Sequence, residues 1–224
     1  MDARLSIVVP VLNEAPGIAA TLQSLAPLRA RGHEVIVVDG GSDDESAALA
    51  GPLCDRVLQA PRGRAVQLNA GARAASGEIL VFLHADTRLP PHADQLIVSA
   101  LQDHAWGRFD VEIEGRHPAL GLIAAALNLR SRLTGIATGD QAMFVRRGNF
   151  PGFPEIALME DVALSRLLKR GGRPACLRRR VRTSGRRWEA RGVLRTVLLM
   201  WRLRALYALG VPAERLARLY RDAR

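Results

Sequence analysis

The sequence predicts an α/β fold with a mostly parallel central sheet flanked by helices. Short apolar segments alternate with amphipathic ones four times within the first 84 residues, and these apolar segments are continuous rather than alternating in polarity. Strands of this kind are buried on both faces and are joined by right-handed helical crossovers. With 48% hydrophobic and 24% charged residues, the 224-residue chain has the composition of one globular domain with a full core.

The first four strands are identified by their apolar runs, and the helices by the spacing of apolar side chains. The segments 5–11 (LSIVVPV) and 33–39 (HEVIVVD) are short and rich in β-branched residues. Ile18, Leu22 and Leu25 lie on one face of the helix between them. The predicted strands are 5–11, 33–39, 55–59 and 78–84, and the helices between them are 18–30, 43–50 and 64–75.

Beyond Pro90 the order of elements changes. The segment 106–114 (WGRFDVEIE) alternates in polarity, which predicts a strand with one exposed face, and 118–133 is a helix rich in Ala and Leu. The remaining predictions are helix 94–103, a short strand within 138–146, helix 160–169, strand 175–181 and helices 193–209 and 213–221. The sequence contains no linker-like segment or repeat, so we expect one domain over residues 1–224.

Charge is distributed unevenly along the chain. The net charge is +10, and all but one of the 32 basic residues are Arg, a bias that genome-wide codon usage explains simply. Residues 1–161 carry a net charge of −5 and residues 162–224 a net charge of +15. A basic C-terminal third indicates an anionic partner: a diphosphate, a membrane surface or nucleic acid. Only 4% of residues are aromatic, without basic–aromatic interleaving, so nucleic acid is not the expected partner.

The sequence predicts a cytoplasmic protein. The N-terminal apolar run is too short for a secretion signal, and Cys54 and Cys176 lack metal-type spacing and fit a reduced compartment, with one disulfide as the alternative. Helix 193–209 is interrupted by arginines and falls short of the roughly 20 apolar residues that a spanning helix needs. Three partners for its apolar side are open: the sheet, a second subunit in a homodimer, or the inner face of the cell membrane.

Polar residues follow three of the predicted strands, where each strand ends. They are Asn13–Glu14, Asp39–Asp43 and His84–Asp86. Ligands of open α/β sheets bind beyond the carboxyl ends of the strands, so these loops are expected to meet at one crevice. Asp39 suits hydrogen bonds from a ribose hydroxyl or a base N–H, and a turn cap is the alternative.

Two further pairs of residues are candidates for metal binding and for catalysis. His84 and Asp86 follow an apolar strand, and because side chains alternate along a strand both point to the same side. The Asp86 carboxylate suits Mg²⁺ or Mn²⁺ bridging to substrate phosphates. Glu160 and Asp161 begin an amphipathic helix. Acidic residues favour helix N-termini for electrostatic reasons alone, and the alternative is that one of them is a general base.

The motifs together resemble glycosyltransferase family 2. They are SIVVPVLNEAPGIAATLQSL, VIVVDGGSDDES, RGRAVQLNAGARAASGEILVFLHADTRLP, TGDQAMFVRR and MEDVALSRLL. The resemblance extends from Ser6 to about Arg195 and is greatest to a small bacterial branch labelled as arsenosugar-biosynthesis glycosyltransferases.

This resemblance implies a GT-A fold, an inverting mechanism, a nucleotide-diphosphate-sugar donor and a divalent metal. The single domain would then consist of a nucleotide-binding part (1–115), an acceptor and catalytic part (116–190) and C-terminal basic helices (191–224). Asp161 matches the family's catalytic base. The implied donor contacts are Pro10, Asn13, Glu14, Asp39, Arg64, Asn69, Ala85, Asp86 and Arg187, and the implied acceptor contacts are Gly139, Asp140, Gln141, Glu160 and Trp188.

The sequence departs from the family pattern at two positions. His84 replaces the first acid of the D-x-D metal motif, so Asp86 would be the main metal ligand with His84 as a helper, and an imidazole favours Mn²⁺ over Mg²⁺. Ser184 replaces the Gln of a Q-x-x-R-W element, so polymer synthesis is not expected. Arg187 and Arg186 are the expected contacts to phosphate oxygens.

Two other classes of function are alternatives for this sequence. A sugar-1-phosphate nucleotidyltransferase would carry a Gly-rich, basic phosphate loop after the first strand, and LNEAPGIAA is not such a loop. A non-catalytic protein that binds nucleic acid or another anion through the basic third is the other. For the transferase, the acceptor is expected to be a small molecule or a lipid.

Overall fold

The computed structural model describes residues 3–222, without the side chains of residues 187, 191, 221 and 222. One eight-stranded sheet runs through the molecule in the order β3-β2-β1-β4-β7-β6-β8-β5. The strands are β1 (Leu5–Val11), β2 (Glu34–Asp39), β3 (Arg56–Gln59), β4 (Ile79–Phe82), β5 (Thr87–Arg88), β6 (Trp106–Glu114), β7 (Met143–Arg146) and β8 (Ala175–Ser184). Only β7 and β5 run antiparallel to their neighbours, so the prediction of a mostly parallel α/β sheet is confirmed.

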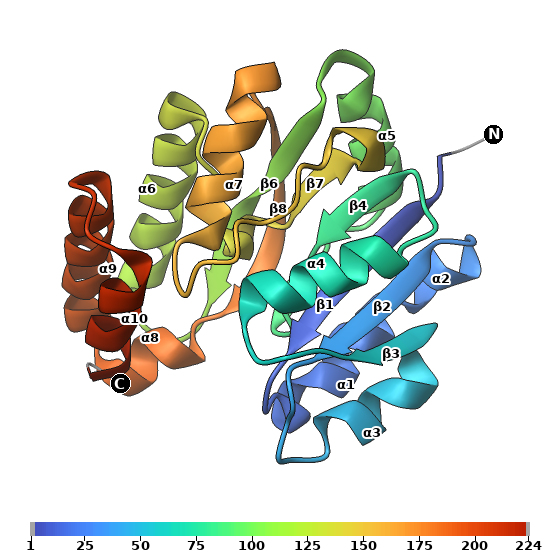
Figure 1. Cartoon of the computed structure of the whole chain (residues 1–224), viewed down its shortest axis with the longest axis horizontal. Coiled ribbons are helices and arrows are strands. Elements are labelled where there is room, and N and C mark those ends of the chain that lie inside the picture. Colours follow the sequence, from blue (N-terminus) through green and yellow to red (C-terminus); the bar gives the residue numbers. More distant parts are fainter. Residues whose placement is uncertain (1–2, 223–224) are drawn as a thin grey trace.

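Helices cover both faces of this sheet (Figure 1). They are α1 (Ala15–Ser24), α2 (Ala26–Ala30), α3 (Ser46–Ala50), α4 (Arg64–Ala74), α5 (Ala93–Asp103), α6 (Ala119–Thr134), α7 (Glu160–Leu168), α8 (Arg186–Arg191), α9 (Val193–Ala208) and α10 (Ala213–Asp222). Alternate residues of β1 divide between two cores. Ile7 and Val9 pack in the core that contains residues of α1, α5 and α6, and Val8 packs in the core that contains residues of α4 and α7.

The last two helices form a hairpin beside α7. A third, small apolar cluster joins them to the body, with Leu203 of α9 and Leu216 of α10 packed against Met159 and Val162. Of the sixteen residues of α9, only Val193 and Leu203 are buried. The hairpin is therefore attached over a narrow area.

The prediction that β6 has an exposed face holds only at the end of the strand. Every residue from Trp106 to Val111 is buried. Arg108 and Asp110 are covered by α6 and form an ion pair with each other, whereas Glu112 and Glu114, farther along the same face, are partly exposed. In the first part of the strand the alternation in the sequence therefore reflects a buried ion pair rather than contact with water.

Some element boundaries differ from the prediction for local reasons. The helix expected at 18–30 divides at Leu25, because Pro27 begins a new helical turn in α2. Strand β4 ends at Phe82 rather than at residue 84, so His84 and Asp86 lie in a loop, and the strand alternation predicted to point them to one side does not apply. The two-residue strand β5 and helix α8 were not predicted.

Candidate active site

A small pocket opens beyond the end of β4. Its polar lining consists of Arg64, His84, Gly139, Glu160 and Asp161, over a floor that includes Phe82 and Met143. These residues come from the starts of α4 and α7, the loop after β4 and the turn before β7. The predicted base and four other predicted site residues therefore lie together.

Asp161 is fixed in this pocket by backbone N–H groups. Its Oδ2 accepts a hydrogen bond from Gly139 N at 2.9 Å, and its Oδ1 accepts one from Val162 N at 2.7 Å. Met159, immediately before the acidic pair, has a φ of 70°, which a side chain of this size rarely adopts. A left-handed conformation of this kind costs free energy of order 1–3 kcal/mol. It persists where the surrounding structure requires it, often at functional sites.

His84 is held between Asp140 and Gly139. Its Nδ1 lies 3.0 Å from Asp140 Oδ1. A Cβ atom added to Gly139 would lie only 2.3 Å from His84 Nε2, so the glycine is needed for the ring to lie against the backbone. The imidazole therefore links the loop after β4 to the turn that orients Asp161.

Arg64 and Glu160 form a charge pair at the same pocket. Arg64 Nη1 lies 3.4 Å from Glu160 Oε1. Burial raises the pKa of Glu160 above its ordinary value, and the positive charge of Arg64 opposes that shift. Burial acts to lower the pKa of Arg64, but the charges of Glu160, Asp140 and Asp161 outweigh it and raise that pKa.

The loops after β1 and β2 are joined by hydrogen bonds. Asn13 N donates to Ser42 Oγ at 3.0 Å and Glu14 N to Ser46 Oγ at 2.8 Å, while Asp43 N donates to Asn13 Oδ1 at 2.9 Å. Asn13 has a φ of 55°, a conformation that Asn tolerates better than most residues. The first loop is thus fixed before any ligand binds.

Asp39 is buried at the end of β2 and organises the turn that follows. Its carboxylate accepts hydrogen bonds from Gly41 N and Ser42 N, both at 3.1 Å, and from Ser42 Oγ. These are the contacts of the turn cap that the sequence offered as the alternative. Next to it, the buried Gln67 of α4 donates through Nε2 to Val11 O and Val38 O, both at 2.8 Å, and joins the ends of β1 and β2.

Comparison with known proteins assigns the family. The model described as "Glycosyl transferase family 2" matches residues 6–148, more than half of the chain. The chain belongs to glycosyltransferase family 2. The match confirms the family resemblance and sets aside the nucleotidyltransferase and nucleic-acid readings, while the arsenosugar branch stays a prediction.

Sequence relatives match part of the chain, and solved structures of low sequence identity share its fold. An uncharacterised glycosyltransferase of Nostoc sp. is 30% identical over 106 residues, covering 44% of this chain and 33% of that protein. TarS of S. aureus superimposes with a TM-score of 0.65 at 18% identity, covering 87% of this chain and 64% of that one. The mannosyltransferase PcManGT of Pyrobaculum calidifontis was solved with GDP-Man and Mn²⁺. It superimposes with a TM-score of 0.60 at 24% identity, covering 81% of this chain and 57% of that one. The chain spans about a third of the length of several curated relatives that it matches.

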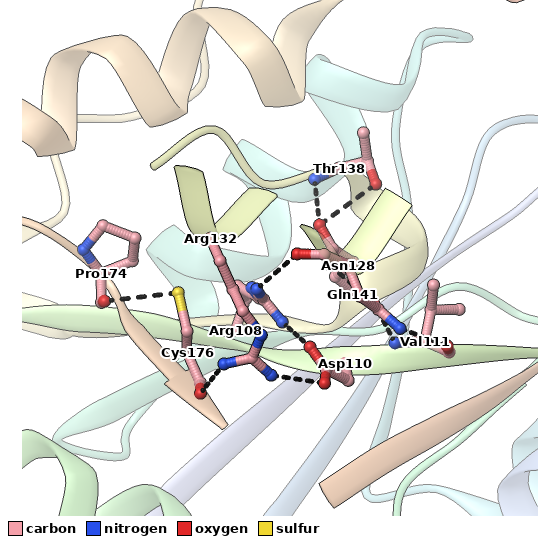
Figure 2. A network of polar contacts seen from close by, with 9 residues as sticks. All are labelled: Arg108, Asp110, Val111, Asn128, Arg132, Thr138, Gln141, Pro174 and Cys176. Atoms are coloured by element: carbon pink, nitrogen blue, oxygen red, sulfur yellow. Dashed lines mark hydrogen bonds and ion pairs between the residues drawn. The ribbon is translucent and has the colours of Figure 1, made fainter. Parts of the chain in front are cut away.

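Two residues predicted as family 2 ligand contacts have internal partners. Asn69 donates to Phe153 O at 2.9 Å and accepts from Phe153 N at 2.8 Å, which fixes the loop before α7. Gln141 is fully buried, and its Oε1 accepts from Thr138 N while its Nε2 donates to Asn128 Oδ1. Figure 2 shows Gln141 within a polar network that also contains Arg108, Asp110 and Arg132.

Other predicted residues do not line the pocket. Pro10 lies in β1 beside Val38 of β2, and the half-buried Trp188 packs against the core. Ala85 O accepts a hydrogen bond from Thr21 Oγ1 at 2.7 Å. Arg186 lies 3.7 Å from Glu14 Oε2, between α8 and the first loop. The side chain of Arg187 lies outside the described residues.

The donor chemistry around Asp86 fits a metal that is carried by a substrate. Among the described residues, no three His, Cys, Asp or Glu side chains cluster closely enough to enclose a metal ion. Mg²⁺ in nucleotide sites is held mainly by one or two carboxylates and by substrate phosphates. The half-buried Asp86, with Thr87 Oγ1 3.4 Å from its Oδ1, supplies one such carboxylate.

Sequence reasoning missed Gln67 and Arg130. The role of Gln67 becomes visible only in the structure, where Gly40 lies so close that an added Cβ would be 2.9 Å from the Gln67 side chain. Arg130, on α6, belongs to none of the sequence motifs.

Proposed function

We propose that this chain transfers a sugar from a nucleotide-diphosphate donor to an acceptor hydroxyl with inversion, and that Asp161 is the general base. The observation that carries the proposal is the position of Asp161. It lines the pocket beside Arg64 and His84, and two backbone N–H groups fix its orientation. A base must be held within hydrogen-bond reach of the proton that it removes.

In this mechanism Asp161 accepts the proton of the acceptor hydroxyl while its oxygen attacks the anomeric carbon. The bond from that carbon to the diphosphate breaks on the opposite side, so the configuration inverts. The preorganised loops after β1 and β2 support binding of the nucleoside, and Asn13, Glu14 and Asp39 are the contacts proposed for it. Arg64 supports the diphosphate, because its guanidinium offers paired donors to phosphate oxygens.

A divalent metal on Asp86 would neutralise negative charge on the departing diphosphate. PcManGT, with the same fold, was solved with Mn²⁺ and GDP-Man. His84 stays a predicted second ligand, although its Nδ1 already contacts Asp140. After treatment with a chelator, turnover should fall and should return further with Mn²⁺ than with Mg²⁺. Equal turnover with and without metal would contradict the metal proposal.

The test of the base is Asp161→Asn. This change keeps the size of the side chain and removes the proton acceptor, so turnover should fall by about a thousandfold or more. Binding of the nucleotide sugar, measured by calorimetry, should stay within about threefold of the unchanged protein.

Glu160→Gln is the matched control, because it alters the neighbouring acid and leaves Asp161 in place. A smaller loss is expected for this variant. If Asp161→Asn turns over normally, or if Glu160→Gln is the more damaged of the two, Asp161 is not the base.

A further inference from the structure

The guanidinium group of Arg130 is buried and has no hydrogen-bond partner among the described residues. Its Nε, Nη1 and Nη2 atoms are shielded from solvent, and among the described residues none of them has a hydrogen-bond partner. The contrast with its neighbour on α6 is direct, because Arg132 pairs with Asp110 and donates to Cys176 O at 3.1 Å. A buried unpaired guanidinium costs several kcal/mol, so a fold rarely keeps one without a use.

A second cation, Arg204 of α9, acts on Arg130. Burial and, to a smaller degree, the positive charge of Arg204 lower the pKa of Arg130 to about 10, while the charge of Asp161 acts in the opposite direction. Burial likewise lowers the pKa of Arg204, against the effect of the same Asp161. Leu203, next to Arg204 in the chain, packs against Met159 and Val162 on either side of the acidic pair, so α9 brings Arg204 to the start of α7, where the proposed base lies.

Asp161 does not neutralise this pair by contact. Its two oxygens accept hydrogen bonds from Gly139 N and Val162 N. In the part of the chain that the structure describes, neither arginine comes within 4.0 Å of a carboxylate oxygen, whereas Arg64 pairs with Glu160. The two guanidinium groups together carry ten N–H hydrogens that can be donated. Among the described residues, no carboxylate in contact with them balances their positive charge.

We propose that Arg130 and Arg204 bind an anionic group of the acceptor, of the phosphate type, and thereby place its hydroxyl beside Asp161. The proposal rests on the proposed function, in which Asp161 receives the hydroxyl proton. The planar fork of arginine matches phosphate oxygens, and charge-assisted hydrogen bonds are strongest where water is excluded.

The anion reaches the pair when α9 shifts. This helix has only two buried residues and is joined to the body mainly by the small cluster around Leu203. Segments with few buried contacts open at low cost in free energy.

The experiment measures binding of inorganic phosphate to the full chain by calorimetry, with UDP or GDP present to fill the donor site. Arg130→Met and Arg204→Met should each weaken phosphate binding by about tenfold or more. Arg73→Met, which removes one exposed positive charge from α4, should leave it unchanged. Equal phosphate affinity in all four proteins, or an equal loss in Arg73→Met, overturns the proposal.

Thermal unfolding separates binding from a structural role. Removing an unpaired buried charge should leave the Tm of Arg130→Met at or above that of the unchanged protein, whereas Arg132→Met should lower the Tm because it breaks an ion pair. A lower Tm in Arg130→Met overturns the proposal. Binding of UDP or GDP tests the proposed function separately, since it should survive in both Arg130→Met and Arg204→Met.

Two sources of phosphate are distinguished with vesicles of phosphatidylcholine, with and without phosphatidic acid. If Arg130→Met also loses binding to the phosphatidic acid vesicles, the acceptor group is a lipid phosphate. If only binding of free phosphate is lost, the acceptor is a soluble phosphate ester.

Discussion

Asp94 illustrates how single charges in this protein are held by specific partners. Its carboxylate, at the start of α5, accepts a hydrogen bond from Arg31 Nε at 2.6 Å and lies 3.1 Å from His33 Nε2. Burial acts to raise the pKa of Asp94, but the hydrogen bonds from Arg31 and His33 outweigh it, and the pKa falls to about 2. The residue therefore favours the folded state while it is ionised.

This shift predicts the direction of a pH effect on stability. Since the folded pKa is below the unfolded value, the stabilisation is fully present above about pH 4 and is lost as the pH falls through about 2. It amounts to about 2 kcal/mol. The difference in free energy of unfolding between the unchanged protein and Asp94→Asn, measured with urea, should shrink by that amount on acidification. Asp103→Asn, at the exposed end of the same helix, is the control, and a pH-independent difference for Asp94→Asn would contradict the assignment.

At the scale of elements, the packing of α4 on the sheet depends on Gly71. A Cβ atom at this position would lie 2.3 Å from Val8 Cγ1 and 3.0 Å from Val38 Cγ2. Helix and sheet therefore approach so closely that no side chain fits between them. The same helix carries Arg64 and Gln67, so this distance also sets the position of the pocket wall.

Gly71→Ala should lower the free energy of unfolding by roughly 1–3 kcal/mol, although alanine is the better helix former. Gly121→Ala in α6 is the matched control, because an added Cβ there meets no atom within 4 Å. That change should raise the free energy of unfolding by roughly 0.5–1 kcal/mol. Denaturant titration of both variants tests the pair, and equal effects would show that close packing at Gly71 is not limiting.

The elements could be predicted to different degrees from the sequence. Continuous apolar runs predicted β1, β2 and β4, and the acidic start of α7 predicted the position of Asp161. Strand β5 could not be predicted, because a two-residue strand exists only through its partner β8. The unpaired Arg130 could not be predicted either, since the burial of its guanidinium depends on tertiary packing and not on a local sequence pattern. Gln141 was predicted as a ligand contact, and only the fold reveals its internal partners.

At the scale of the whole molecule, apolar side chains are exposed on the C-terminal side. Leu194, Leu198 and Trp201 lie on one exposed face of α9, with Trp201 70% exposed. Arg195 and Arg202 are exposed beside them. In residues 3–222 no helix combines the length and the apolar content that a membrane crossing requires. Apolar residues flanked by arginines suit the surface of an anionic membrane.

We therefore expect binding to anionic vesicles. Replacing Leu198 and Trp201 together by Ala should reduce co-sedimentation with anionic vesicles by about tenfold, since the apolar area that enters the interface is lost. Leu49→Ala, in the partly exposed helix α3, should have no effect. If the double variant co-sediments normally, or if it changes a dimer measured by light scattering instead, this surface has another partner.

The pairing of β5 with β8 has a consequence for how the protein folds. Thr87 and Arg88 pair with Thr183 and Arg182, and the hydroxyls of Thr87 and Thr183 lie 3.0 Å apart. The loop that carries His84 and Asp86 is therefore anchored at one end by β4 and at the other by a strand that is synthesised almost a hundred residues later. Contacts between such distant parts of a chain form late and slow the folding rate. During synthesis, the loop that carries His84 and Asp86 stays incomplete until β8 has left the ribosome.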